Sequence, residues 1–442
     1  MTVNATSALR RLLLLLAAPI ALTAQDAPAP EPDIEGLTQA IARARVALRD
    51  LPTLWGIDGG GVDWILTDGR RHLATARVDG RDTLRWKALP VGTTIANTAV
   101  TVDGRRWAMV VLDLSRPERA STSLLVHEAM HTFQPEQLPA PGGTEAAVGG
   151  DFLDGPDGRA WLFLELRALA EALRSTGEVQ RQAARDALAF RARRDALAQP
   201  QERTRLDALD LQEGIPEYTG WRLAGFSDSA LADRLAGAAT ARVSWVRAVA
   251  YWTGPGYGYL LDQLGARGWR DAQRGGARLP ELLAQAVGAA AASEVALDAR
   301  AVRYDGPQIF AAEERRARAN AARLDSLRQR FVQGPAIRLY PRALQISFDP
   351  NGQTPLGNDG TVMLNFRWAG SDGAELVAAG GAIVSPNWDW IQVPVDAAQL
   401  TEGTLSDGLS VEGSGWRVTV PAGWSVTRVG TRYELRPPAA ER

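Results

Sequence analysis

Short segments in which hydrophobic and polar residues alternate run from about residue 53 to residue 114. The clearest are 62–66, 72–78 and 107–112, and turns such as Asp68-Gly69 and Asp103-Gly104 separate them. Alternation is typical of a strand with one buried face, and Asp-Gly favours the tight turn of a hairpin. The sequence therefore predicts an antiparallel sheet of hairpins over about 53–114.

The spacing of hydrophobic positions changes to about 3.6 residues between about residues 121 and 330, where Ala, Leu, Arg and Glu predominate. This stretch is predicted to be mostly helical. Helix breaks are expected at Pro135, in the Gly- and Pro-rich loop 139–158 and at Gly254-Pro255-Gly256. Proline cannot donate the helical hydrogen bond, and glycine is a poor helix former.

Alternation returns after Gln333, in segments that include 336–340, 344–348, 362–368 and 433–436. An all-β domain, either a sandwich or a small barrel, is predicted for 333–442, with its boundary near 332–335. The predicted fold class is α+β, with the first sheet and the helices together in residues 34–332. A chain of 442 residues is longer than one hydrophobic core usually serves, which agrees with more than one domain.

The first residues are predicted to be an export signal and not part of the fold. Arg10 and Arg11 precede an apolar run over 12–24, which is the pattern of a signal peptide over 1–24. Residues 25–33, rich in Pro and Ala, are predicted to be a disordered lead-in. We expect a periplasmic or secreted protein without a membrane span after cleavage, because the apolar run is shorter than the roughly 20 residues that a span needs.

Charge and cysteine content exclude several classes of protein. The 51 acidic residues nearly balance the 49 basic ones, and the basic residues form no dense block, so neither a nucleic-acid partner nor a polybasic membrane surface is expected. The chain has no cysteine, which excludes disulfides, thiolate catalysis and cysteine metal ligands.

The segment His127-Glu128-Ala129-Met130-His131 carries the strongest chemical signal. Residues four apart lie on one face of a helix, so both imidazoles can bind one Zn²⁺, with Glu128 beside them as a general base. The chain has only three histidines, which makes a chance match rare. The alternative is a helix whose histidines satisfy ordinary hydrogen bonds. Ser121, Thr122 or Ser123 is expected to cap the helix.

A catalytic zinc site usually has three protein ligands, so a carboxylate is needed as the third. Two segments offer one, Glu165 in the apolar helix 161–167 and Glu213 in 211–218. Glu165 has the alternative role of pairing with Arg167 or Arg194, or of orienting a histidine ligand. Glu213 has the alternative role of a carboxylate at a helix N-terminus. His72, in the predicted sheet, is expected to be an ordinary strand residue.

The segment Glu213-Gly214-Ile215-Pro216-Glu217-Tyr218 resembles the helix start on which gluzincin peptidases, including aminopeptidase N-like enzymes, carry their glutamate ligand. The resemblance implies a zincin-like catalytic domain over 34–332, with Glu213 as the third zinc ligand. Tyr251-Trp252-Thr253-Gly254 resembles the Tyr-x-x-Gly segment of that family, which implies that Tyr251 donates to the oxyanion of the transition state. Tyr218, Tyr257 and Tyr259 are alternatives. Together the matches cover about 121–264.

The chain also departs from the family. Glu213 follows His131 by 213 − 131 = 82 positions, against 165 − 131 = 34 for Glu165, and an inserted helical hairpin over roughly 160–209 would account for the longer gap. No Gly-x-Met-x-Asn segment precedes the histidines. The resemblance therefore does not imply that this protein binds the free amino terminus of a substrate as the aminopeptidases do. The strand 107–112 is either an edge strand that receives an extended peptide or an ordinary core strand.

The expected function is that of a zinc metallopeptidase acting on a peptide or protein substrate, in which Glu128 serves a metal-activated water as general base. The alternative is a non-catalytic, zinc-stabilised binding or assembly protein of the cell envelope. A zinc site with an open ligand position favours the enzyme, whereas a closed four-ligand site favours the structural role. The oligomeric state carries no sequence signal.

Overall fold

The computed structural model describes residues 31–68, 71–79, 81–90, 93, 95–111, 116–138, 151–241, 244–288, 294–342, 345–348, 352–395 and 400–439. These residues form two compact units. The first contains the chain up to Leu138 together with Thr219–Phe226, and the second contains Pro139–Tyr218 and everything from Ser227 onward. The predicted signal peptide and most of the predicted lead-in lie outside the described residues. The predicted boundary near 332–335 is a change from helix to strand inside the second unit.

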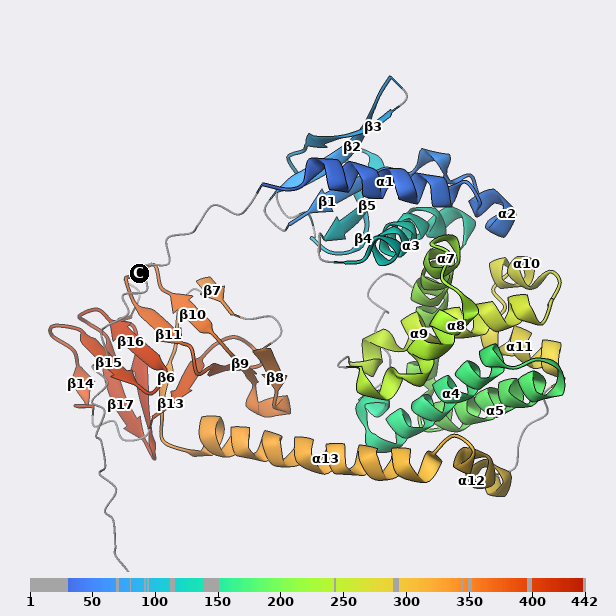
Figure 1. The fold of residues 1–442 in the computed structure, drawn as a ribbon. Coiled ribbons are helices and arrows are strands. Elements are labelled where there is room, and N and C mark those ends of the chain that lie inside the picture. Colours follow the sequence, from blue (N-terminus) through green and yellow to red (C-terminus); the bar gives the residue numbers. More distant parts are fainter. Residues whose placement is uncertain are drawn as a thin grey trace, which may run out of the picture. The chain divides into compact units, whose positions relative to one another are not determined.

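The first unit combines two longer helices with one five-stranded sheet (Figure 1). Its helical elements are α1 (Ile34–Leu48), α2 (Leu51–Trp55), η1 (Gly59–Gly61) and α3 (Glu118–Gln137), and its strands are β1 (Trp64–Thr67), β2 (His72–Val78), β3 (Arg81–Trp86), β4 (Thr98–Val102) and β5 (Arg105–Val111). The strand order is β3-β2-β1-β5-β4.

The prediction of hairpins alone is wrong for the centre of this sheet. β1 and β5 run parallel, with Trp64 beside Ala108, whereas the other neighbours are antiparallel. All four residues of β1 and the middle of β5 are buried, and strands buried on both faces are typical of parallel pairing. Because β5 has partners on both sides, the described part of the predicted strand, 107–111, is an ordinary core strand and not an edge.

Helix α3 is fixed to the sheet and to helix α7 (Ile215–Leu223) within the first unit. The indole Nε1 of Trp64 donates to the carbonyl oxygen of Leu125 at 3.0 Å. Gly220 of α7 approaches α3 so closely that a Cβ would lie 2.6 Å from the Ser123 carbonyl oxygen. The Trp55 indole donates to the Thr219 hydroxyl at 2.9 Å. These contacts hold the segment that carries the two histidines from both sides.

The helices of the second unit confirm the prediction of a mostly helical region. They are α4 (Pro156–Arg174), α5 (Gly177–Asp195), α6 (Pro200–Leu209), the start of α7, α8 (Asp228–Ala236), α9 (Trp245–Gln263), α10 (Trp269–Arg274), α11 (Leu279–Val287), α12 (Glu294–Val302) and α13 (Gly306–Arg328), with shorter turns η3 (Asp151–Asp154), η4 (Asp210–Gly214), η5 (Ala238–Thr240) and η6 (Gln329–Gln333). None of the helices in the described part of the chain combines the length and apolarity that crossing a membrane requires.

Three predicted helix boundaries are wrong. Helix α3 continues two residues past Pro135, and α9 continues through Pro255. Glu213 does not begin a helix either, because α6, the π-turn η4 and α7 form one continuous run. A regular α-helix would drive the Pro216 ring into the carbonyl of Gln212, four residues earlier, and a π-turn at this place relieves that clash.

The C-terminal part of the second unit is a sandwich of two separate sheets and not a closed barrel. Their strand orders are β15-β16-β11-β10-β7 and β14-β17-β18-β6-β13-β12-β9-β8. The strands are β6 (Ala336–Leu339), β7 (Gln345–Ser347), β8 (Gln353–Pro355), β9 (Thr361–Met363), β10 (Phe366–Ala369), β11 (Glu375–Ala378), β12 (Ala382–Val384), β13 (Ile391–Pro394), β14 (Gly403–Thr404), β15 (Leu409–Gly413), β16 (Trp416–Val420), β17 (Ser425–Val429) and β18 (Arg432–Arg436), with η8 (Gly357–Asp359) between β8 and β9. Both sheets contribute to one core around Trp368, Leu376 and Ile337.

Candidate metal centre

The helix that carries the histidines begins at an earlier residue than predicted and lacks the predicted side-chain cap. Helix α3 starts at Glu118 after Pro117, without a side-chain cap. Ser121, Thr122 and Ser123 lie inside the first turns, where the Thr122 hydroxyl donates to the carbonyl oxygen of Glu118 at 3.0 Å. The acidic Glu118 in the first turn interacts favourably with the helix dipole.

His127 and His131 bring their imidazoles together on one face of α3. Their Nε2 atoms are 3.2 Å apart, and the rings meet edge to face with centroids 4.9 Å apart. Glu128 lies beside the pair, with Oε2 at 3.8 Å from His131 Nε2. His127 and Glu128 are almost fully buried, at 2% and 3% exposed. The ligand atoms of the three residues lie within 4.8 Å of one another, so this buried group could hold a metal ion.

Gln134 orients His131, and the sequence analysis did not foresee this residue. The Gln134 Oε1 atom is 2.7 Å from His131 Nδ1. An amide oxygen can only accept, so Nδ1 carries the proton and a neutral His131 presents a lone pair at Nε2. A histidine that ligates a metal commonly donates its other ring nitrogen to such an acceptor. The signal in the sequence was the spacing, because Gln134 follows His131 by three positions on the same helical face.

The separation of the two Nε2 atoms fits a shared metal ion. Nitrogen ligands bound tetrahedrally to zinc at about 2.0–2.1 Å stand roughly 3.3 Å apart. The observed 3.2 Å is close to that value. The two Nε2 atoms are within hydrogen-bond distance of each other, and a cation bound by both would take the place of that contact. The residues present could therefore hold a metal ion.

Glu213 and Tyr251 lie together in the second unit. The Tyr251 hydroxyl donates to Glu213 Oε2 at 2.7 Å, from α9 to the π-turn η4. Gly214 and Gly254, which accompany these residues in the sequence, explain the closeness of the two elements: a Cβ on Gly254 would lie 2.4 Å from the Cα of Gly214. The structure thus joins the two segments that carried the family resemblance, 213–218 and 251–254.

Glu165 has the structural role that was its alternative. It is fully buried, with Oε1 accepting from the Tyr257 hydroxyl at 2.8 Å and Oε2 accepting from Arg194, while Arg191 lies 3.7 Å away. Burial raises the pKa of Glu165, against the lowering effect of Arg194 and Arg191. Both of its oxygens have protein partners, which leaves it poorly suited to bind a metal.

The other tyrosines named as oxyanion donors have different partners. The Tyr257 hydroxyl donates to Glu165, and the Tyr218 hydroxyl donates to Asp262 at 2.7 Å. Burial raises the pKa of both hydroxyls. Tyr259 is buried with its ring against that of Tyr218. The Tyr251 hydroxyl, as described above, donates to Glu213.

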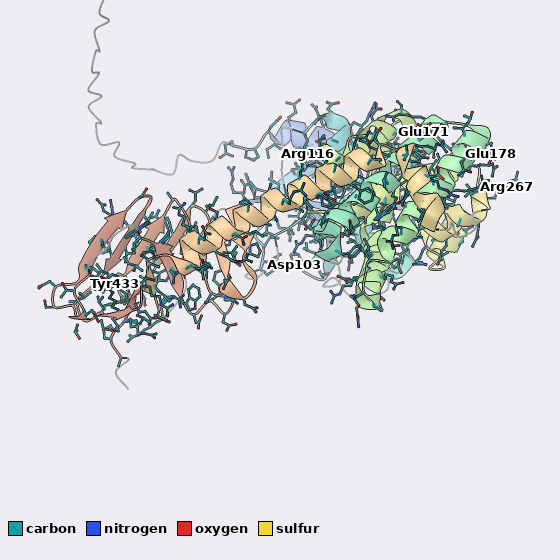
Figure 2. All side chains as sticks on the ribbon, turned by 90° about the horizontal axis from the view of Figure 1, so that it is seen from below. Asp103, Arg116, Glu171, Glu178, Arg267 and Tyr433 are labelled. Atoms are coloured by element: carbon teal, nitrogen blue, oxygen red, sulfur yellow. The ribbon has the colours of Figure 1, made fainter. Side chains whose placement is uncertain are left out.

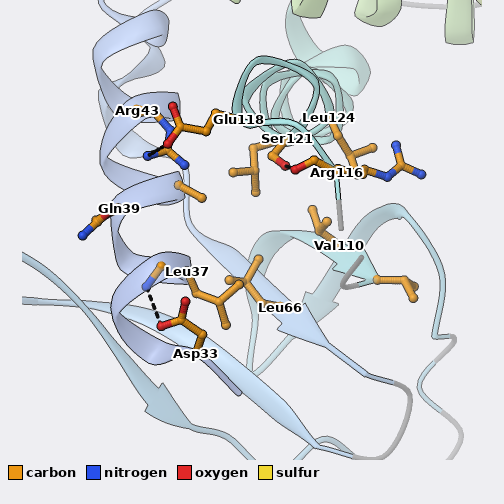
Figure 3. Close-up of a pocket in the computed structure, with 14 residues that line it drawn as sticks. Asp33, Leu37, Gln39, Arg43, Leu66, Val110, Arg116, Glu118, Ser121 and Leu124 are labelled. Carbon is orange, nitrogen blue, oxygen red and sulfur yellow. Dashed lines mark hydrogen bonds and ion pairs between the residues drawn. The ribbon is translucent and has the colours of Figure 1, made fainter. Parts of the chain in front are cut away.

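His72 and an apolar cavity of the first unit involve other residues than the three of the candidate metal centre. The Nδ1 atom of His72 forms a hydrogen bond with the Thr67 hydroxyl at 2.7 Å, as a strand residue of β2. A cavity of about 230 Å³ lies between α1, the first turns of α3 and the ends of β1 and β5 (Figure 3). Leu37, Leu66 and Leu124 line it, with Arg43 at its edge, and none of the three metal-centre residues is part of its wall.

The chain was compared with protein-family models, with curated proteins and with solved structures, and none of them matches it.

Proposed function

We propose that the protein is a zinc-dependent peptidase. The observation that carries the proposal is the convergence of His127 Nε2 and His131 Nε2 at 3.2 Å, with the Glu128 carboxylate beside them. Spacing in the sequence and geometry in the structure agree here, and both match the pair of ligands and the base of an HExxH zinc site.

We propose Glu213 as the third ligand. It directly precedes α7, whose Thr219 and Gly220 belong to the first unit together with α3. In that unit Gly220 packs on Ser123, one helical turn before His127. Glu165 has both oxygens engaged by Tyr257 and Arg194, which disfavours it as a metal ligand.

Each chain residue has a distinct role in the proposed mechanism. Zinc held by these ligands would lower the pKa of a water molecule and polarise the scissile carbonyl. Glu128 takes the proton of that water and passes it to the leaving amine. Tyr251 donates to the developing oxyanion. Its hydroxyl donates to Glu213 in the structure, and since a phenol has one proton, Tyr251 has to release Glu213 as the oxyanion forms.

The substrate class and the location follow from the sequence. We propose a peptide or protein substrate outside the cytoplasm, because the first 24 residues have the pattern of a signal peptide. The C-terminal sandwich carries no histidine, and we assign it to binding or docking and not to catalysis.

Metal content and peptide cleavage test the proposal. The wild type is expected to retain stoichiometric zinc after dialysis, and His127→Ala and His131→Ala are expected to lose it. Glu128→Gln keeps the shape of the site, so it should retain zinc and lose about a hundred- to ten-thousandfold in cleavage of a mixed peptide library. Glu165→Gln is the matched control for Glu213→Gln, because both replace a buried helical glutamate.

Each result has a distinct meaning. Zinc retained in Glu213→Gln but lost in Glu165→Gln would reverse the choice of ligand. A zinc-containing protein that cleaves no peptide, and whose melting temperature falls when zinc is removed, would instead be the zinc-stabilised binding protein of the alternative hypothesis. Equal cleavage by wild type and Glu128→Gln would contradict the role of the general base.

A further inference from the structure

The π-turn η4 carries two buried acidic side chains three positions apart, and both are held by neighbouring helices. Tyr251 of α9 holds Glu213, as described above. Asp210 accepts from Arg191 of α5 at Oδ2 and from the Thr253 hydroxyl of α9, 3.3 Å away, at Oδ1. Asp210 and Glu213 are 9% and 8% exposed, so neither of these contacts is weakened much by solvent.

The register of the helical run is fixed on both sides of the π-turn. Before it, Asp207 of α6 accepts two hydrogen bonds from Arg278 at 2.8 Å each. After it, Tyr218 of α7 donates to Asp262. A π-turn contains one residue more than an α-helical turn, and each residue of a helix turns the chain by about 100°. The direction of Glu213 therefore depends on where between these two anchors the extra residue is accommodated.

Arg191 links this turn to the buried ion network of the helical hairpin. Its guanidinium pairs with Asp210, lies 3.4 Å from Asp195 and 3.7 Å from Glu165, and is stacked near the Tyr257 ring. Arg194, its neighbour, pairs with Glu165 and Asp195 but not with the π-turn. Burial opposes the charge on Arg191, yet Asp210 and Asp195 raise the pKa of its guanidinium well above the usual value.

We infer that Arg191 and Asp210 are positioning residues that fix the register of the π-turn and so aim Glu213 at its metal. The inference rests on the proposed function, in which Glu213 is a zinc ligand. In this arrangement Arg191 acts on the metal only through Asp210 and the backbone of η4. The strength of metal binding is then set in part by an ion pair that touches neither metal nor substrate.

The test compares zinc affinity in two matched substitutions of the same network. Asp210→Asn removes the charge that anchors the π-turn, and Asp195→Asn removes a charge that also pairs with Arg191 but lies outside the turn. Zinc dissociation constants are measured on the full chain by competition with a chromogenic chelator. We expect Asp210→Asn to weaken zinc binding about ten- to a hundredfold, the usual effect of losing a partner that orients a ligand. Asp195→Asn should bind zinc like the wild type.

Thermal unfolding of the metal-free variants separates positioning from a general loss of stability. Both Asn variants should be destabilised, because each leaves a buried arginine short of a partner. Thr253→Val, which removes the other donor to Asp210, is the milder variant should Asp210→Asn not fold, and it should weaken zinc binding by less.

Failure of the inference is distinguishable from failure of the proposed function. A wild type without zinc would overturn the proposed function. Zinc bound by the wild type, lost in Glu213→Gln and unchanged in Asp210→Asn and Thr253→Val would overturn the positioning role alone. Equal weakening in Asp195→Asn and Asp210→Asn would also overturn it, because the effect would then follow stability and not the π-turn.

Discussion

Two buried glutamates of the second unit, Glu165 on α4 and Glu213 on η4, lie in contrasting surroundings. Glu165 is fully buried and has an arginine on one oxygen and a tyrosine on the other. Glu213 lies on a distorted turn, is slightly exposed, and has a tyrosine hydroxyl on Oε2. Removing a carboxylate that is paired with buried arginines destabilises a fold, whereas π-turns are frequent at functional sites.

The largest expected effect is on stability, from Glu165→Ala. Removing this carboxylate takes the fully buried partner from Arg194 and one of three nearby carboxylates from Arg191, which should cost about 3–5 kcal/mol of unfolding free energy in urea titrations. Glu178→Ala is the control on α5, because Glu178 pairs with Arg185 at the exterior and should be replaceable without measurable loss (Figure 2). A Glu165→Ala protein as stable as the Glu178→Ala control would contradict the structural role of Glu165, and with it the contrast between Glu165 and Glu213.

A smaller effect is expected from Gly254→Ala, which probes the surroundings of Glu213. The added methyl would lie 2.4 Å from the Cα of Gly214, and overpacking against backbone should cost about 1–3 kcal/mol. Zinc affinity should fall as well, since η4 has to move. Gly256→Ala is the control two positions later, where the new methyl meets Leu169 Cδ1, the movable end of a side chain, at 3.0 Å. Equal losses at both positions would show that the helix crossing has no special role.

The smallest expected effect is a pH dependence that belongs to Glu165. Burial raises its pKa above 4.5, so the folded protein holds a proton here at pH values where the unfolded chain has lost it. The stability that this group contributes is full below about pH 4.5 and is lost as the pH rises through the folded-state pKa. The unfolding free energy of wild type minus that of Glu165→Gln should therefore fall as the pH rises above about 4.5. A difference that grows with pH would mean that Arg194 outweighs burial.

Much of the fold was predictable from periodicity, because burial follows the spacing of apolar residues. The change from alternating to helical to alternating pattern located the first sheet, the helices and the C-terminal sandwich. Periodicity did not predict the parallel pairing of β1 with β5, because an alternating strand does not specify its partner. It also misplaced helix ends at Pro135 and Pro255, because a proline weakens a helix without always ending it.

The sequence by itself determined the local chemistry of the metal centre. The four-residue spacing of His127 and His131 places them on one helical face whatever surrounds the helix, and Glu128 follows covalently. Only the tertiary structure shows how the two glutamates differ, because the partners of Glu165 and Glu213 come from other helices. The same holds for the pairing of Arg191 with Asp210 across 19 positions, which depends on how α5 packs beside η4.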